Sequence, residues 1–431
     1  MFNDRNNYED EEDDEEWLAD LQGLKENNPE TTELERRGEY NYVQNMADDG
    51  WEELGQDIAS NTHLRSLSLY ERALNDHKLS CLFRRLTRSS SIRDVSFSDN
   101  GLSAVGLRSM VPFLQNANNL TNLDLEGNNI QSEGFNLLFR ALRDSPIYFL
   151  HCGRCGIESI EIDNNHIPEH LTLLNLSSNF INADGCRGLA KLLQGGNATL
   201  KQLHLYDNKI DDDGVEILAD ALQNNTSLTA LGLVGNDGIS KHGMTILLKL
   251  VNDVSSINAT LQSNHTLRNL LVKEINHNEF DPHEEIQTHV NVATEINGNS
   301  GSDPEAAGKE KVIQTLLHSM KRSQLCRLQG IDRSLYSEID PLHLPEVLSL
   351  IAQRHGEGEL YAAVLSSIMT LCSTMNREKC IQQERDYHAA KAAEHIAKVE
   401  ELDKELASIK EAAAMRSQDN VCFQSNKRRR T

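Results

Sequence analysis

The sequence lacks the features that direct a chain into or across a membrane. The N-terminus has no basic start followed by an apolar stretch, and no run of about 18 apolar residues occurs anywhere. Cysteines are also sparse, because eight are scattered along 431 residues instead of forming a dense disulfide framework. We therefore predict a protein of the cytoplasm or nucleus, with reduced thiols and no membrane partner.

Aromatic residues, basic residues and catalytic motifs are scarce as well. Aromatics make up 5% of the chain, so apolar area has to come mainly from Leu, Ile, Val and Ala. Acidic residues outnumber basic ones by 66 to 42, and the dense basic cluster is confined to Lys427–Arg430, which argues against a nucleic acid partner. The chain has no P-loop, G-x-S-x-G, H-E-x-x-H or dinucleotide fingerprint. We predict a protein that is not an enzyme and uses no cofactor.

What the sequence does contain is a repeat between residues 64 and 272. Six segments follow the pattern L-x-x-L-x-L-x-x-N-x-L, and they begin at Leu64, Ile92, Leu120, Leu171, Leu200 and Leu228. Two less regular units open at Ile147 and Leu267. A period of about 28 residues indicates a solenoid, in which each unit is one supersecondary element stacked on its neighbours.

Each unit is predicted to contain one strand and one helix. Alternating apolar residues place Leu123 and Leu125 in the core and leave Asp124 and Glu126 pointing outward. A Gly after most strands is followed by apolar residues four and eight positions on, which is the spacing of an amphipathic helix. The expected fold class is therefore α/β, a solenoid with a parallel sheet inside and helices outside, over residues 40–275.

A polar residue follows each predicted strand. Where the chain turns inside the coil, an Asn side chain can satisfy buried backbone groups with both its donor and its acceptor. We expect this structural ladder at Asn100, Asn128, Cys155, Asn179, Asn208 and Asn236. The pattern resembles the ribonuclease-inhibitor (RNI-like) type of leucine-rich repeat, which also occurs in NOD-like receptors and Ran GTPase-activating proteins. The resemblance implies a horseshoe fold and says little about activity.

Two cysteines lie close together in the spacing that zinc and redox sites share. In the repeat register Cys152 takes a core Leu position and Cys155 takes the ladder position. A zinc site would need two more ligands, which the neighbouring sequence does not offer, and a redox motif would cap a helix rather than straddle a strand end. We therefore favour a core role for both cysteines over a metal site or a redox site, and we predict no metal.

The outward strand positions line the concave face of the predicted sheet, the surface that a solenoid offers to partners. This row is polar, is acidic toward its N-terminal half and contains two tyrosines that can anchor a partner. We predict a scaffold or interaction module for a protein with basic and apolar groups. The expected partner-binding residues are Tyr70, Asp94, Asp124, Glu126, His151, Arg154, Asn175, His204, Tyr206 and Asp207.

The alternative function is a regulatory GTPase-activating protein of the Ran type. Such proteins share this repeat and carry an acidic tail, but their tail follows the repeats, whereas the acidic tail precedes them here. Arg72 takes the ladder position of the first unit and Arg154 an exposed one, yet neither lies in a motif that aligns with a catalytic Arg. The residues therefore favour the interaction module.

Two units depart from the regular repeat. The unit opening at Ile147 is short, and its Pro168 with the polar sequence DNNH predicts a truncated helix. The unit before Leu267 holds an insertion, which we interpret as a surface loop or a short helical excursion.

The ends of the chain are predicted to lie outside the sheet. Residues 1–35 carry eight consecutive acidic residues and should be a disordered tail, which either solubilises the chain or flanks a short docking helix. A capping half-repeat is expected near residues 40–63. Toward the C-terminus we predict a linker at 276–310 and a helical unit closing the solenoid at 311–380. Residues 381–415 should form either a long, exposed single helix or a short coiled coil that pairs two chains through 383–413. Residues 416–431 are a basic tail that is either solvated or a nuclear-import signal.

Overall fold

The structure is a computed structural model, and it describes residues 15, 17–37, 45–70, 73–163, 167–194, 199–255, 257–272, 284–301, 303–317, 324–325 and 327–329. All of them belong to the first of two compact units, residues 1–340. The predicted coiled coil, its dimer contact, the basic tail and most of the helical unit at 311–380 lie outside the described residues.

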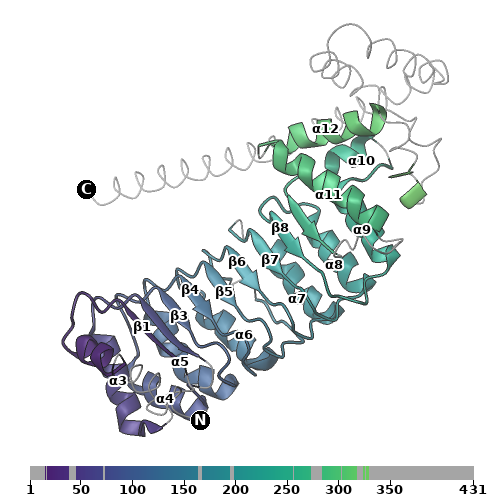
Figure 1. The fold of residues 1–431 in the computed structure, drawn as a ribbon. Helices are drawn as coiled ribbons and strands as arrows, with labels where there is room; N and C mark the ends of the chain where they lie inside the picture. The colour runs from purple at the N-terminus through teal and green to yellow at the C-terminus, as the bar shows by residue number, and fades with distance from the viewer. Residues whose placement is uncertain are drawn as a thin grey trace, which may run out of the picture. The chain divides into compact units, whose positions relative to one another are not determined.

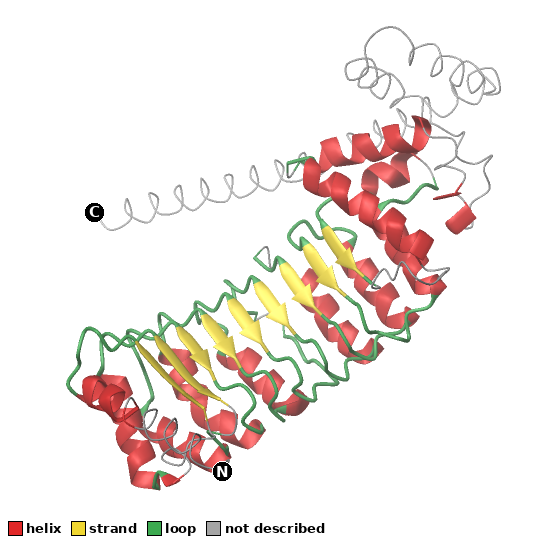
Figure 2. Cartoon of the chain, in the orientation of Figure 1, coloured by secondary structure: helices red, strands yellow, loops and turns green. Residues whose placement is uncertain are grey.

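Nine strands form one parallel sheet in which each strand pairs with the next strand of the chain. Figure 2 shows these strands side by side, with helices along one side of the sheet. In most strands the central residue is buried and its two neighbours are more exposed, so one side of the strand faces the core. We call the other side of the sheet, away from the helices, the open face. The strands are β1 (Glu33–Arg37), β2 (Ser66–Tyr70), β3 (Asp94–Ser96), β4 (Asn122–Asp124), β5 (Phe149–His151), β6 (Leu173–Asn175), β7 (Gln202–His204), β8 (Ala230–Gly232) and β9 (Asn269–Leu271).

Helices return the chain between most strands and pack on one another in chain order (Figure 1). Several begin at a side chain that caps free N–H groups; Asn75 accepts from the Lys78 N–H at 2.9 Å. The predicted α/β solenoid is confirmed by this alternation of strand and helix. The helices are α3 (Asp48–Ser60), α4 (Asp76–Arg85), α5 (Ala104–Asn116), α6 (Gln131–Ala141), α7 (Ala183–Gln194), α8 (Asp212–Leu222), α9 (Lys241–Val251), α10 (Ile257–Gln262), α11 (Glu284–Asn299) and α12 (Pro304–Leu317).

The Gly of the helical half-repeat allows successive helices to approach closely. Asp76, in the first turn of α4, accepts from the Ser103 N–H at 2.8 Å and from the Ser103 hydroxyl at 2.5 Å. A Cβ added at Gly106 would lie 2.3 Å from the Asp76 carboxylate, closer than real contacts allow. Gly106, and likewise Gly243 beside Asp212, thus leaves room for the carboxylate that caps the start of the next helix.

The N-terminal end of the sheet begins earlier than predicted. Residues 17–25 are helical, and β1 adds a further strand beside β2. Trp17 and Leu34 are buried, and the Arg36 guanidinium carbon lies 5.8 Å from the Trp17 ring centroid. The prediction of disorder throughout residues 1–35 is therefore wrong from residue 17 onward, because this segment buries apolar area over the end of the sheet.

The C-terminal end of the sheet is also closed by residues that the sequence places elsewhere. The predicted linker at 276–310 is wrong for α11, which packs against α9 and β9. Gln287 Nε2 donates to the Leu270 carbonyl at 3.1 Å, and Asn297 Nδ2 donates to the Leu267 carbonyl at 2.5 Å. These amides satisfy backbone groups of the last unit. The buried face of α11 is therefore more polar than the buried faces of the helices between the strands.

The two irregular units differ from the others as expected. Among the described residues between β5 and β6 there is no helix, and Ile160 and Ile162 are buried there. The insertion before β9 contains the short helix α10. Across the described part of the chain, no helix has both the length and the apolar character needed to span a bilayer.

Candidate functional site

The open face presents a continuous row of polar side chains. The strand register aligns the last residue of each short strand with that of the next, and most of these side chains are half-buried. From β2 to β7 the row is Ser68, Ser96, Asp124, His151, Asn175 and His204. Four of the predicted partner-binding residues, Asp124, His151, Asn175 and His204, therefore lie on one surface that six successive strands form.

The N-terminal half of the open face is acidic and internally ordered. Asp124 Oδ2 accepts from the Ser96 hydroxyl at 3.2 Å, and Asp124 Oδ1 accepts from the Glu126 N–H at 2.9 Å. Asp94 accepts a hydrogen bond from the Asn122 amide one strand away. These bonds hold the Asp124 and Asp94 carboxylates at fixed places on the sheet, while leaving them partly accessible.

Arg154 adds a positive charge next to these carboxylates. Its Nε lies 3.2 Å from Glu126 Oε1 and its guanidinium lies 3.4 Å from Asp99 Oδ2. Arg154 has φ of 51°, and Asp99, Asp207 and Ser178 take the same left-handed conformation at equivalent places just before the ladder residue. The acidic half is thus partly compensated, which the sequence pattern does not indicate.

Tyr70 contacts a strand that the sequence analysis did not include. The Tyr70 hydroxyl donates to the Glu35 carboxylate of β1. Its ring therefore belongs to the acidic end of the open face, and its hydroxyl is engaged within the chain.

The other half of the open face carries imidazole and phenol groups. The rings of His204 and Tyr206 lie 5.4 Å apart between centroids. Burial, and then the neighbouring His151, lower the pKa of His204 from its usual value. Asn175 Oδ1 accepts from the Ser177 hydroxyl at 2.7 Å. Asp207, by contrast, is exposed and lies three residues after the end of β7.

The ladder residues join each unit to the one before it. Asn128 Nδ2 donates to the Phe97 and Leu125 carbonyls at 2.8 and 2.7 Å, while Asn128 Oδ1 accepts from the Leu102 N–H at 2.9 Å. Corresponding side-chain bonds are made by Asn100, Asn179, Asn208 and Asn236. Buried backbone groups at these five turns are satisfied in this way.

These repeated turns match known repeats. The sequence profile described as "Leucine Rich repeat" matches residues 116–135, 168–190 and 196–219. Porcine (Sus scrofa) ribonuclease inhibitor is 29% identical over 189 residues, which cover 42% of this chain and 41% of that protein. These units are leucine-rich repeats of the ribonuclease-inhibitor-like type.

Leucine-rich-repeat proteins of greater length are similar to this chain as well. Human (Homo sapiens) "NACHT, LRR and PYD domains-containing protein 14" is 28% identical over 198 residues, which cover 43% of this chain and 18% of that protein. The chain thus spans less than half the length of these relatives. The yeast Rad7–Elc1 complex aligns with 50% of this chain and 54% of its own, at 15% identity and a TM-score of 0.34, which is too low to support an inference.

Both cysteines of the CxxC sequence are buried within the leucine-rich repeats. Cys155 Sγ donates to the Leu125 carbonyl at 3.2 Å, where an Asn amide stands in the regular units. The hydrogen bond with Cys155, together with burial, raises the pKa of the Cys152 thiol well above its usual value. A raised pKa disfavours the thiolate that metal binding and redox exchange require.

Two aromatic side chains were missed as candidates. Phe149 is 39% exposed and lies in register between Asn122 and Leu173 on the open face. Tyr148 is 44% exposed beside the ring of His170. Strand alternation alone indicates that Phe149 faces outward, because Leu150 is the core residue of β5.

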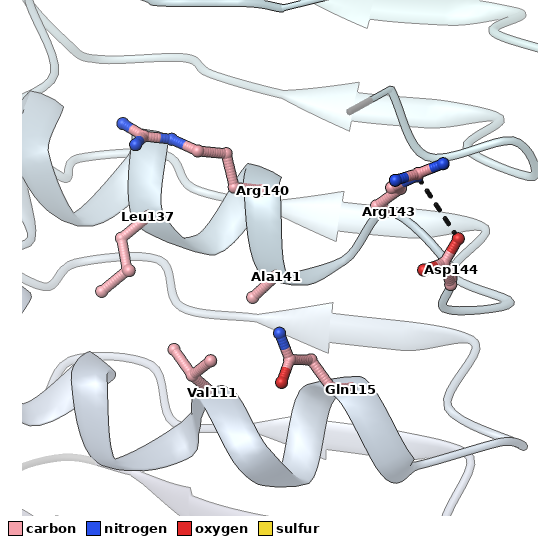
Figure 3. Close-up of a pocket in the computed structure, with 7 residues that line it drawn as sticks. All are labelled: Val111, Gln115, Leu137, Arg140, Ala141, Arg143 and Asp144. Atoms are coloured by element: carbon pink, nitrogen blue, oxygen red, sulfur yellow. Dashed lines mark ion pairs between the residues drawn. The ribbon is translucent and has the colours of Figure 1, made fainter. Parts of the chain in front are cut away.

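A surface groove lies on the helical side of the repeats, between α5 and α6. In Figure 3, Val111 and Gln115 of α5 face Leu137 and Ala141 of α6 across it. Of its two arginines, Arg140 donates to the Asn136 carbonyl at 3.0 Å and Arg143 lies 3.5 Å from the Asp144 carboxylate. Arg140 also lies 3.9 Å from the Glu161 carboxylate, so both arginines are paired within the chain and do not converge on the groove.

Proposed function

We propose that the chain is an interaction module that binds a protein partner on the open face of its leucine-rich repeats. The observation that carries this proposal is the continuous face itself, in which polar side chains from successive strands stand in register and no helix of the described residues covers them. A surface of this extent suits a protein better than a small metabolite, which needs a concave pocket.

The partner should offer basic groups beside an apolar contact. Asp94, Asp124 and Glu126 supply negative charge, and Phe149 supplies exposed aromatic area one strand further along. Charge complementarity mainly accelerates encounter, whereas a buried aromatic anchor slows dissociation. The porcine relative is by name an inhibitor of a ribonuclease, which supports a protein as the ligand of such repeats.

No observation favours the Ran-type alternative. Arg72 lies outside the described residues, and Arg154 is paired with Glu126 and Asp99. We also propose, from the sequence, that the protein acts in the cytoplasm or nucleus.

Charge reversal on the open face tests the proposal. Asp124→Lys with Glu126→Lys should recover severalfold less of the protein partner in affinity purification than the parent, because it inverts the local potential. The matched control is Glu216→Lys with Asp220→Lys, which changes the same charge on exposed positions of α8. Circular dichroism verifies that both variants are folded. Parental recovery by the open-face variant would refute this acidic half as the binding site.

A further inference from the structure

A cluster of metal-binding side chains lies between α3 and α4, outside the open face. His77 Nε2 is 2.9 Å from the Asp48 carboxylate, and Cys81 Sγ is 3.9 Å from the same nitrogen. One ligand atom from each residue lies within 4.8 Å of the others. His77 and Cys81 are four residues apart on α4 and so project from one side of that helix, toward the first residue of α3.

These distances are close to those of a zinc site. Zinc binds imidazole nitrogen at about 2.0 Å and thiolate sulfur at about 2.3 Å, so tetrahedral N and S ligands stand about 3.6 Å apart. The observed 3.9 Å between His77 Nε2 and Cys81 Sγ requires a shift of only a few tenths of an ångström. A nitrogen, a sulfur and a carboxylate together suit Zn²⁺ better than Mg²⁺ or Ca²⁺, which prefer oxygen ligands.

The surroundings also suit a cation. The Cys81 side chain lies on the buried side of the cluster, whereas the side chains of Asp48 and His77 are 63% and 66% exposed. An ion can therefore enter from solvent and retain a water ligand on its outer side.

We propose that Asp48, His77 and Cys81 bind one Zn²⁺ ion, with water in the fourth position, and that the ion joins α3 to α4. Binding displaces the thiol proton of Cys81 to solvent and leaves a zinc-bound thiolate. The sequence does not point to this set of ligands, because Asp48 and His77 are 29 residues apart and belong to different units. The competing interpretation is a metal-free ion pair between Asp48 and His77 above a packed thiol.

Cobalt titration of the metal-free full chain distinguishes these interpretations. The parent should bind one equivalent of Co²⁺ with a thiolate-to-cobalt charge-transfer band, and Zn²⁺ should displace the cobalt. His77→Ala and Cys81→Ser should each lose the band, and Asp48→Asn should weaken binding by about tenfold or more. Cys186→Ser, which removes a buried thiol from α7, should keep the band.

A thermal readout provides the second measurement. Zn²⁺ should raise the thermal midpoint of the parent and leave that of His77→Ala unchanged, because a ligand stabilises only the state that binds it. His77 is exposed, so its replacement decides the outcome even where Cys81→Ser fails to fold. The proposal is overturned if the parent shows no thiolate band at one equivalent, or if His77→Ala retains it.

Discussion

At the scale of single residues, Asn128 joins two successive repeats through its side chain. Its amide donates to two carbonyls, and its oxygen accepts from the Leu102 N–H of the preceding unit. Asn128→Ala should lower the free energy of unfolding by about 1–3 kcal/mol for each buried group that loses its partner. Urea denaturation followed by circular dichroism measures this loss.

The adjacent Asn129 provides the control for this substitution. Asn129 is exposed, so Asn129→Ala should change the free energy of unfolding by no more than about 0.5 kcal/mol. Equal stability of the parent and Asn128→Ala would contradict the assigned role of the ladder.

Residue positions were more predictable than residue contacts. The alternation of the repeat indicates that Asp124 points outward, because each strand has one apolar side. It does not indicate that Arg154 reaches Asp99, 55 residues away, since that contact depends on a side-chain rotamer and on a left-handed backbone. The Tyr70–Glu35 hydrogen bond was not predictable for a similar reason, because the sequence pattern does not indicate that β1 pairs with β2.

At the scale of elements, the regular repeats were predictable and the segments that close the sheet were not. A capping segment has to present an apolar side to the sheet and a polar side to solvent or to the last backbone groups. α11 therefore buries Gln287 and Asn297 beside its apolar residues, and its sequence looks like a linker. The sequence predicted a helix near residue 17 only as an alternative that docks onto a partner, because the acidic run that precedes it favours disorder.

Lys311 of α12 makes the C-terminal end of the repeats sensitive to pH. Its side chain is buried, and Nζ donates to the Val251 carbonyl at 2.5 Å and lies 3.1 Å from His265 Nδ1. Burial lowers the pKa of Lys311 to about 7 from the ordinary 10.5. The cost of burying the charged form is fully present below pH 7 and is relieved as the pH rises toward 10.5.

We therefore expect the free energy of unfolding to rise between pH 7 and about 10, by at most about 1.4 kcal/mol per pH unit from this group. Lys311→Met should remove that contribution, and Lys309→Met on the same helix should retain it. The difference between parent and variant, measured by urea denaturation at each pH, isolates Lys311. His265 does not contribute in this window, because burial and Lys311 lower its pKa to about 4.

At the scale of the whole molecule, the sheet has two ends that would otherwise expose backbone groups and apolar side chains. At the first end β1 covers the edge of β2, and the Thr32 carbonyl accepts from the Arg65 N–H at 2.6 Å. An uncovered parallel edge strand is a template for pairing with another chain. The segments that cover the ends of the sheet should therefore limit association between chains as well as stabilise the fold.

Two truncations distinguish the contribution of the acidic run from that of the segment that contains Trp17 and β1. Removal of residues 1–37 takes away β1 together with the buried Trp17 and Leu34, so we expect a lower free energy of unfolding and more association than in the parent. Removal of residues 1–14 leaves β1 and Trp17 in place and should match the parent in both properties. Urea denaturation and light scattering at several protein concentrations measure the two effects. The longer truncation contradicts this role of β1 if its free energy of unfolding and its light scattering equal those of the parent. An exposed β2 edge would then neither destabilise the sheet nor promote association between chains.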